Sequence, residues 1–260
     1  MECKLNGTAR LLRVPRIVCA SALVLLAVAA PRSSGQPVAD DSGSGTRAST
    51  LVFDSLRDLD IQGIGEPGAE PVKIQQEVTS YRGRRAVRIV NIEGKGAQTG
   101  EQVLAIVESS AFKDGTIEAD VAGIPREGAK PDTRGFVGIA FRVQGHGSRF
   151  EAFYLRMTNG RAGNQLQRNH STQYVSHPDF PWRRLRNENP GIYESYVDLN
   201  AGAWTKIKIV VSENQAQLYV NGADQPCLVV NDLKLGDAGG QVALWIGSDT
   251  DAYFSKLTIR

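Results

Sequence analysis

The chain has 260 residues, of which 41% are hydrophobic and 22% are charged, and its formal net charge is +2. Residues 1–35 hold five basic residues and one acidic residue, which leaves 25 basic and 27 acidic residues, a net charge of −2, for residues 36–260. This balance excludes the electrostatic attraction on which nucleic-acid binding depends, so we expect no nucleic-acid partner.

The N-terminal residues are typical of an export signal. Basic residues precede an apolar run at 17–30, and small residues follow it. Because this run is too short to span a bilayer comfortably, we predict a signal peptide at 1–35, a secreted or periplasmic protein, and no membrane span after cleavage. The alternative is an uncleaved signal anchor. Two of the three cysteines lie in this segment, and the remaining Cys227 is expected as a small buried apolar side chain.

Residues 36–50 are polar and small, which predicts a disordered leader. From residue 51 to residue 260, alternating polar and apolar runs separated by short turns predict antiparallel strands with one buried face. The predicted strands are 51–53, 72–78, 86–92, 101–107, 115–123, 135–143, 149–156, 191–199, 204–211, 215–222, 227–230, 241–247 and 253–259. A short helical turn is expected only near 182–188. We therefore predict a single all-β domain, either a sandwich or a barrel.

Alternation also assigns faces to three strands that follow one another in the sequence. The residues expected on the buried face are Ile117, Ala119, Val121, Val137, Ile139, Phe141, Val143, Phe153 and Leu155. The opposite face combines small residues with hydrogen-bonding ones, which include Glu118, Arg142, Tyr154 and Arg156. If the three strands are neighbours on a concave sheet, this second face forms the floor of a groove. The alternative is an ordinary solvated outer face.

The segment 157–203 shows no strand pattern before 191–199 and is rich in aromatic residues, arginine and histidine. A long irregular insertion in a small domain is usually functional or a lid. Tyr174 and Trp182 offer flat faces on which sugar rings can stack, and Arg183 offers charged donors for hydroxyl or carboxylate groups. The alternative is structural, because aromatic residues in loops often anchor the loop.

Three residues are candidates for proton transfer. His170 and His177 titrate near neutral pH, and Glu118 is a carboxylate on the expected groove floor. We expect Arg142, Tyr154 and Arg156 to bind the substrate beside them. The alternative for each histidine is a purely structural role.

Metal and nucleotide motifs are absent from the sequence. His170 and His177 do not have a recognisable zinc spacing, and no Walker A, dinucleotide or G-x-S-x-G motif occurs. We therefore expect no metal or other cofactor. Asp249 and Asp251 supply the carboxylate oxygens that calcium prefers, which leaves a calcium ion as an alternative.

From residue 51 onward the chain resembles the concanavalin A-like lectin/glucanase superfamily, and within it the secreted bacterial 3-keto-disaccharide hydrolase domains. The resemblance rests on the order of these segments: FKDGTIEADV at 112–121, GFVGIAFRV at 135–143, FEAFYLR at 150–156, GAWTKIKIVV at 202–211, QLYVNG at 217–222 and FSKLTI at 254–259. It implies a two-sheet antiparallel jelly-roll β-sandwich with one long irregular insertion, a carbohydrate ligand, and cleavage of 3-keto-glycosides.

The chain departs from the glucanases of this fold at one strand. Those enzymes carry E-x-D-x-x-E, whereas here Glu118 and Asp120 are followed by Gly123 in place of the second glutamate. The paired carboxylates of retaining hydrolysis are therefore missing from this strand. Cleavage of a 3-keto sugar by elimination needs only a base and a group that polarises the ketone. Two alternatives stay open, a carbohydrate-binding module without catalytic activity and a laminin-G-like interaction domain.

Overall fold

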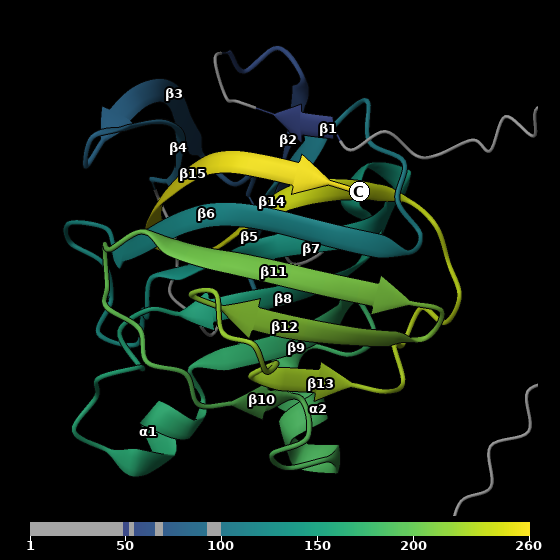
Figure 1. Ribbon diagram of the computed structural model, residues 1–260. Coiled ribbons are helices and arrows are strands. Elements are labelled where there is room, and N and C mark those ends of the chain that lie inside the picture. Colours follow the sequence, from purple (N-terminus) through teal and green to yellow (C-terminus); the bar gives the residue numbers. More distant parts are fainter. Residues whose placement is uncertain (1–48, 52–54, 66–69, 93–99) are drawn as a thin grey trace, which may run out of the picture. The chain divides into compact units, whose positions relative to one another are not determined.

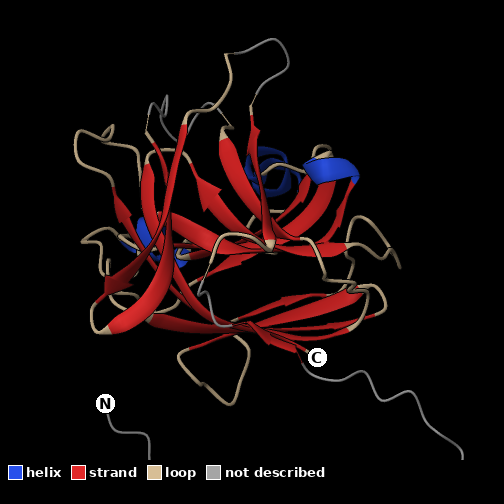
Figure 2. Ribbon diagram, turned by 90° about the horizontal axis from the view of Figure 1, so that it is seen from above, coloured by secondary structure: helices blue, strands red, loops and turns tan. Residues whose placement is uncertain are grey.

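The computed structural model describes residues 49–51, 55–65, 70–92 and 100–260, so the predicted signal peptide and nearly all of the predicted leader lie outside the described residues. Within those ranges the strands form two antiparallel sheets, one of eight strands and one of seven. They face each other as two layers (Figure 2). The prediction of an all-β jelly-roll sandwich is confirmed. No helix in the described ranges is long and apolar enough to cross a membrane.

The eight-stranded sheet lies toward the viewer in Figure 1. Its spatial order is β13 (Leu228–Val230), β12 (Gln215–Val220), β11 (Thr205–Ser212), β6 (Gly115–Pro125), β15 (Thr250–Ile259), β4 (Arg84–Asn91) and β3 (Ile74–Tyr81), and β1 (Ser49–Leu51) pairs with β15. The seven-stranded sheet has the order β10 (Glu194–Ser195), β9 (Thr172–His177), β8 (Arg149–Arg156), β7 (Phe136–Gln144), β14 (Gln241–Gly247), β5 (Gln102–Val107) and β2 (Leu59–Ile64).

Three short helices complete the described part of the chain. A 3-10 helix, η1 (Gly145–Gly147), connects β7 to β8, and α1 (Gln165–Asn169) and α2 (Trp182–Glu188) flank β9 in the sequence. Both α-helices lie at the same end of the sandwich, near β9 and β10 (Figure 1). The helical turn predicted near 182–188 is confirmed as α2.

Alternating residues from both sheets form the core between the layers. Ile117 of β6 and Phe153 of β8 belong to this core and are buried, as the alternation predicts. The opposite face of the seven-stranded sheet carries a second apolar cluster, which includes Phe136, Tyr154 and Trp245. This sheet therefore buries apolar side chains on both of its faces. Its outer face is not an ordinary solvated surface, and a cavity can form against it.

The predicted irregular insertion contains a full strand. Residues 172–177 form β9, which pairs with β8, whereas the strand predicted at 191–199 is reduced to β10. Although the sequence TQYVSH is mostly polar, its residues alternate between the two faces of the sheet. Tyr174 faces the core between the sheets, and Val175 belongs to the outer cluster. The sequence pattern also does not predict strand β2. Strand β1 begins at Ser49, inside the predicted leader.

A β-bulge overturns the face predicted for Arg142. Its φ is 53°, and the pairing register of β7 with β8 shifts between Phe141 and Gln144. The extra residue reverses the alternation that follows. Val143 therefore joins the outer cluster, and the side chain of Arg142 is fully buried with its guanidinium on the carbonyl oxygens of Lys113, Glu213 and Gly236.

Candidate functional site

A cavity of about 540 Å³ lies on the outer face of the seven-stranded sheet, where α1 and α2 border it. Strands β5, β7, β8, β9 and β14 supply residues to its wall, together with both helices and the loops beside them. Its volume lies within the range of small-molecule sites, about 300–1,000 Å³.

Three aromatic rings form the floor of the cavity. The rings of Tyr154 and Trp245 stack with their centroids 4.3 Å apart, and Phe136 meets Tyr154 edge to face at 6.2 Å. The stack spans β7, where Gly138 pairs with both Tyr154 and Trp245. A Cβ on Gly138 would lie 2.7 Å from the Cβ of Tyr154. The glycine therefore leaves the space in which the two rings meet.

A hydrogen-bonded chain orients His177 at one side of the floor. The indole Nε1 of Trp245 donates to Oε1 of Gln102 at 2.6 Å, and Nε2 of Gln102 lies 3.3 Å from Nδ1 of His177. Because an indole N–H can only donate, it fixes the orientation of the Gln102 amide, whose nitrogen then faces the imidazole. Nδ1 of neutral His177 is thus the acceptor and its Nε2 carries the proton. The imidazole also stacks on Phe150 at 4.9 Å.

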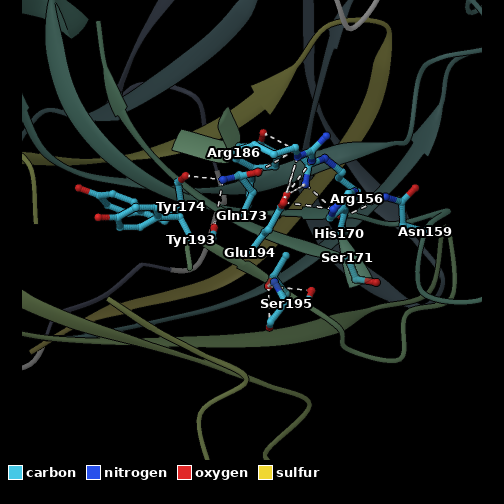
Figure 3. A network of polar contacts seen from close by, with 12 residues as sticks. Arg156, Asn159, His170, Ser171, Gln173, Tyr174, Arg186, Tyr193, Glu194 and Ser195 are labelled. Carbon is cyan, nitrogen blue, oxygen red and sulfur yellow. Dashed lines mark hydrogen bonds and ion pairs between the residues drawn. The ribbon is translucent and has the colours of Figure 1, made fainter. Parts of the chain in front are cut away.

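A second histidine is paired with a buried carboxylate (Figure 3). Nε2 of His170 lies 3.1 Å from Oε1 of Glu194, whose side chain is only 4% exposed. Arg186 approaches the same carboxylate with two nitrogens, at 2.9 and 2.6 Å, and Arg156 lies 3.8 Å from it. Two positive charges and a histidine thus surround one negative charge in a poorly solvated position.

His170 is held in its neutral form. Burial lowers the pKa of His170; the charge of Glu194 opposes that shift, while Arg186 and Arg156 add to it. With Nε2 donating toward the carboxylate, neutral His170 keeps its lone pair on Nδ1. The backbone oxygen of His170 accepts from both Arg156 and Asn159, at 3.1 and 3.0 Å, so its position at the end of α1 is fixed. This geometry suits a general base.

Arg156 connects the floor of the cavity to this pair. Besides the His170 carbonyl, its guanidinium donates to the Tyr154 hydroxyl at 3.2 Å and to Oε1 of Gln173 at 3.0 Å. Burial lowers the pKa of Arg156 and raises the pKa of Tyr154. The tyrosine therefore remains protonated at neutral pH and can act as a hydrogen-bond donor or acceptor.

Trp182 lines the cavity from the first turn of α2. Arg186 and Arg183 place their guanidinium carbons 4.7 and 5.0 Å from the centre of its ring, and Arg156 does so at 5.8 Å. The fully buried side chain of Leu185 anchors the helix in the core between the sheets. Trp182 is half-buried and presents an aromatic wall beside the cationic groups.

Five of the residues predicted from the sequence meet at this cavity: Tyr154, Arg156, His170, His177 and Trp182. Four do not line it. Glu118 lies on β6 in the other sheet, where Lys206 pairs with it at 2.7 Å. The expectation that β6 lies beside β7 and β8 is therefore wrong, because β6 pairs with β11 and β15.

The other three predicted residues do not line the cavity, each because of its own surroundings. Arg142 is turned into the core by the bulge. Tyr174 is buried in strand β9 and donates to Oε1 of Glu151 at 2.6 Å, so its ring is not available for stacking on a sugar. Arg183 is exposed on α2 and packs on Trp182 outside the cavity.

Sequence reasoning missed Gln102, Glu194 and Trp245. Trp245 carries a local signal, since in QVALWIG it alternates with the core residues Leu244 and Ile246. No local pattern marks Glu194, because its place in the site depends on contacts with residues distant along the chain.

The described residues contain no cluster of three or more His, Cys, Asp or Glu side chains suited to a metal ion. Asp249 pairs with Arg126 and Asp251 pairs with Arg88, each at 2.8 Å. Arginine thus already supplies the positive charge near both carboxylates, and the pair does not fit a calcium site.

No protein-family model matches the chain, and no curated protein sequence is detectably similar to it. Solved structures do align with it. A protein of unknown function with a galectin-like fold from Bacillus subtilis has a TM-score of 0.50 and 10% identity, over 79% of this chain and 90% of that one.

Two further structures align at lower scores. The carbohydrate-binding module CBM66 from Bacillus subtilis has a TM-score of 0.46 and 14% identity, over 73% of this chain and 93% of that one. A prokaryotic β-1,3-1,4-glucanase (lichenase) from a mouse hindgut metagenome has a TM-score of 0.48 and 13% identity, over 82% and 98%. At 10% identity the likeness to the protein of unknown function from Bacillus subtilis concerns the fold alone, and the chain shares its galectin-like fold.

Proposed function

We propose that this domain is a carbohydrate-active enzyme that cleaves 3-keto-glycosides in the cavity bordered by α1 and α2. The observation that carries the proposal is the pairing of His170 with Glu194, beside two arginines and facing an aromatic floor. The resemblance of the sequence to 3-keto-disaccharide hydrolase domains implies no catalytic residues by itself. The His170–Glu194 pair adds candidates for them.

The lining of the cavity suits a sugar. Sugar rings present C–H faces to aromatic rings and hydroxyl groups to polar side chains. Trp182 and the Tyr154–Trp245 stack supply aromatic surface, and Gln167 and Asp132 supply hydrogen-bonding groups in the lining. The volume of about 540 Å³ is ample for one sugar ring with part of a second.

The chemistry proceeds by elimination followed by hydration. A ketone at C3 acidifies the C2–H bond, and Nδ1 of His170 takes that proton. The released electron pair forms the C1=C2 double bond as the C1–O bond breaks, and the leaving oxygen takes the proton that His170 now holds, which returns the imidazole to its neutral form. Water then adds across the double bond, so the net reaction is hydrolysis. His177, with its proton on Nε2, polarises the C3 carbonyl during the first step.

Glu194 acts through His170. Its carboxylate fixes the tautomer and stabilises the imidazolium that forms when Nδ1 takes the proton. Arg186 and Arg156 balance the carboxylate charge, which keeps His170 neutral in the resting state. Because burial lowers the pKa of His170, the base stays neutral further into acidic solution than an exposed histidine does.

The test uses 3-keto derivatives of several disaccharides, labelled with deuterium at C2, beside the ordinary disaccharides. We expect turnover of the keto-sugars only, with loss of the label. His170→Gln should lower kcat by about 10²–10⁴, the usual contribution of a general base. The matched control is His146→Gln, an exposed histidine outside the cavity. Cleavage that retains the C2 label would contradict the elimination.

A non-catalytic carbohydrate-binding module is the second candidate. The observation that favours it is that Arg186 and Arg156 are both engaged with protein acceptors, an arrangement that also suits a rigid binding wall. Saturable sugar binding without turnover of any keto-sugar would establish this alternative.

A further inference from the structure

Gln102 of β5 places a buried amide beside the aromatic floor of the cavity. The residue is only 9% exposed, and it lines the cavity together with the stacked rings of Tyr154 and Trp245. Its Oε1 accepts from Nε1 of Trp245 at 2.6 Å, and its Nε2 lies 3.3 Å from Nδ1 of His177. Both ends of the amide are therefore engaged with residues of the cavity wall.

The pairing of the strands does not require the contact between Gln102 and His177. Strands β14, β7 and β8 lie between β5 and β9. In a flat sheet, four spacings of about 4.8 Å would keep β5 and β9 about 19 Å apart. The two side chains nevertheless meet, so the outer face of the sheet is concave here and they converge across the floor of the cavity. The amide thus has a role other than joining neighbouring strands.

The amide gives His177 a hydrogen-bonding role opposite to that of His170. The carboxylate of Glu194 can only accept, so Nε2 of His170 donates to it and the lone pair of that imidazole is on Nδ1. Nε2 of Gln102 can only donate, so Nδ1 of His177 accepts and Nε2 holds the proton. The cavity therefore contains one imidazole that can accept from a ligand and one that can donate to it.

We propose that Gln102 is a specificity-determining residue, whose amide makes the cavity select, at His177, an oxygen that can only accept a hydrogen bond. Trp245 is a positioning residue for this role, because its indole N–H holds the amide in the orientation that directs its nitrogen to the imidazole. A carbonyl or ether oxygen meets the requirement. The inference rests on the proposed function only where it identifies that oxygen as the ketone of the sugar.

An amide and a carboxylate at position 102 should select different ligands. In Gln102→Glu the carboxylate can accept from both neighbours, so it keeps the bond from Trp245 and draws the proton of neutral His177 to Nδ1. Nε2 of His177 then carries the lone pair, which repels a ketone oxygen. A hydroxyl group can donate as well as accept, so it can bind either form of the imidazole. The substitution should disfavour a ketone and spare the matching alcohol.

The first measurement is the ¹⁵N NMR spectrum of the histidine side chains in the full chain. The chain has three histidines, and the variants His146→Gln and His177→Gln assign their signals. At pH 9, where the imidazoles are neutral, we expect the proton of His177 on Nε2 in the wild type. We expect it on Nδ1 in Gln102→Glu, with the signals of His170 unchanged.

Two further variants are measured in the same way. Trp245→Phe keeps an aromatic ring beside Tyr154 but removes the donor that orients the amide, so both forms of His177 should be present. Gln217→Glu adds the same charge on β12 of the other sheet and should change the form of neither cavity histidine. Circular dichroism checks that each variant is folded. If Gln102→Glu does not fold, Trp245→Phe decides, and an unchanged form of His177 in it would overturn the inference.

The second measurement compares a 3-keto-glycoside with its parent glycoside, which has a hydroxyl group at C3. Calorimetry is done at the lowest pH at which the spectrum of Gln102→Glu shows a neutral His177. The substitution should weaken binding of the keto-sugar about tenfold or more, the effect of leaving one polar contact of the ligand unmade. It should change the affinity for the parent glycoside less than about twofold.

Two results would overturn the inference. One is a His177 proton on the same nitrogen in the wild type and in Gln102→Glu, and the other is an equal loss of affinity for the ketone and the alcohol. If the wild type neither binds nor cleaves any keto-sugar, the proposed function fails. The spectra alone then decide whether Gln102 sets the form of His177.

Discussion

Arg142 is a buried cation in the region between the two sheets. Its guanidinium contacts three backbone carbonyl oxygens and lies 3.2 Å from Asp114 and 3.6 Å from the fully buried Glu151. Burial raises the pKa of Glu151, which shows how costly its charge is at this position. The arginine offsets that cost and ties the loop before β14 to β7, so one side chain stabilises several segments.

Removing Arg142 should destabilise the fold strongly. Arg142→Ala leaves Glu151 without its nearest cation and three carbonyl groups without a donor, and we expect a loss of about 3–5 kcal/mol in the free energy of unfolding. Arg149→Ala, at an exposed position at the start of β8, should stay within about 0.5 kcal/mol of wild type. Urea unfolding followed by tryptophan fluorescence measures both. A small effect in Arg142→Ala would show that the site is solvated.

His170 should make stability depend on pH. Its pKa is lowered in the folded state, so the unfolded chain binds the proton first as pH falls below about 6.5. The stabilisation it provides is thus present above pH 6.5 and is lost as pH falls toward the folded pKa. The groups that face it are Glu194, Arg186 and Arg156. We expect wild type to lose more stability than His170→Gln between pH 7.5 and 5.5, and parallel losses in both proteins would contradict the assignment.

Helix α2 illustrates how an element too short to be stable alone is fixed by tertiary contacts. Isolated helices shorter than about 12–15 residues are marginal in water, and α2 has seven residues. Leu185 anchors it to the core, and Arg186 joins it to Glu194 of β10. The same two residues orient Trp182 toward the cavity and leave Arg183 outside.

The two faces of α2 should respond differently to substitution. Trp182→Ala removes an aromatic wall of the cavity and should weaken sugar binding about tenfold. Arg183→Ala changes a side chain outside the cavity and should leave the affinity within about twofold, because a residue that does not line the cavity makes no direct contact with the ligand. Isothermal titration with the sugar that binds wild type best compares the two variants. A larger loss in Arg183→Ala would mean that the ligand binds on the outer side of the helix.

At the scale of the whole molecule, stability rests on the core between the sheets. Within the described part of the chain the one cysteine is Cys227, which is free and whose pKa burial raises to about 11. A thiol with this pKa is almost entirely protonated at neutral pH and therefore unreactive. We also propose that the protein is exported, on the basis of the N-terminal sequence.

Export and independence from disulfides can be tested together. The protein recovered from the periplasm or medium should begin between residues 28 and 37 by N-terminal sequencing, give a β-rich far-ultraviolet circular dichroism spectrum, and melt at the same temperature with and without reductant. Retention of residues 1–35 would support the uncleaved anchor. A melting temperature that falls in reductant would reveal a disulfide between chains.

The sequence by itself determined the class of fold, most strands and their buried faces, because period-two alternation follows from the geometry of a strand. It also singled out five residues that line the cavity, Tyr154, Arg156, His170, His177 and Trp182. Tertiary structure alone decided that β6 belongs to the other sheet, which removes Glu118 from the cavity, and that a bulge turns Arg142 inward. It also brought Glu194 to His170. Strand order and bulges depend on contacts between segments distant along the chain, and local alternation carries no record of them.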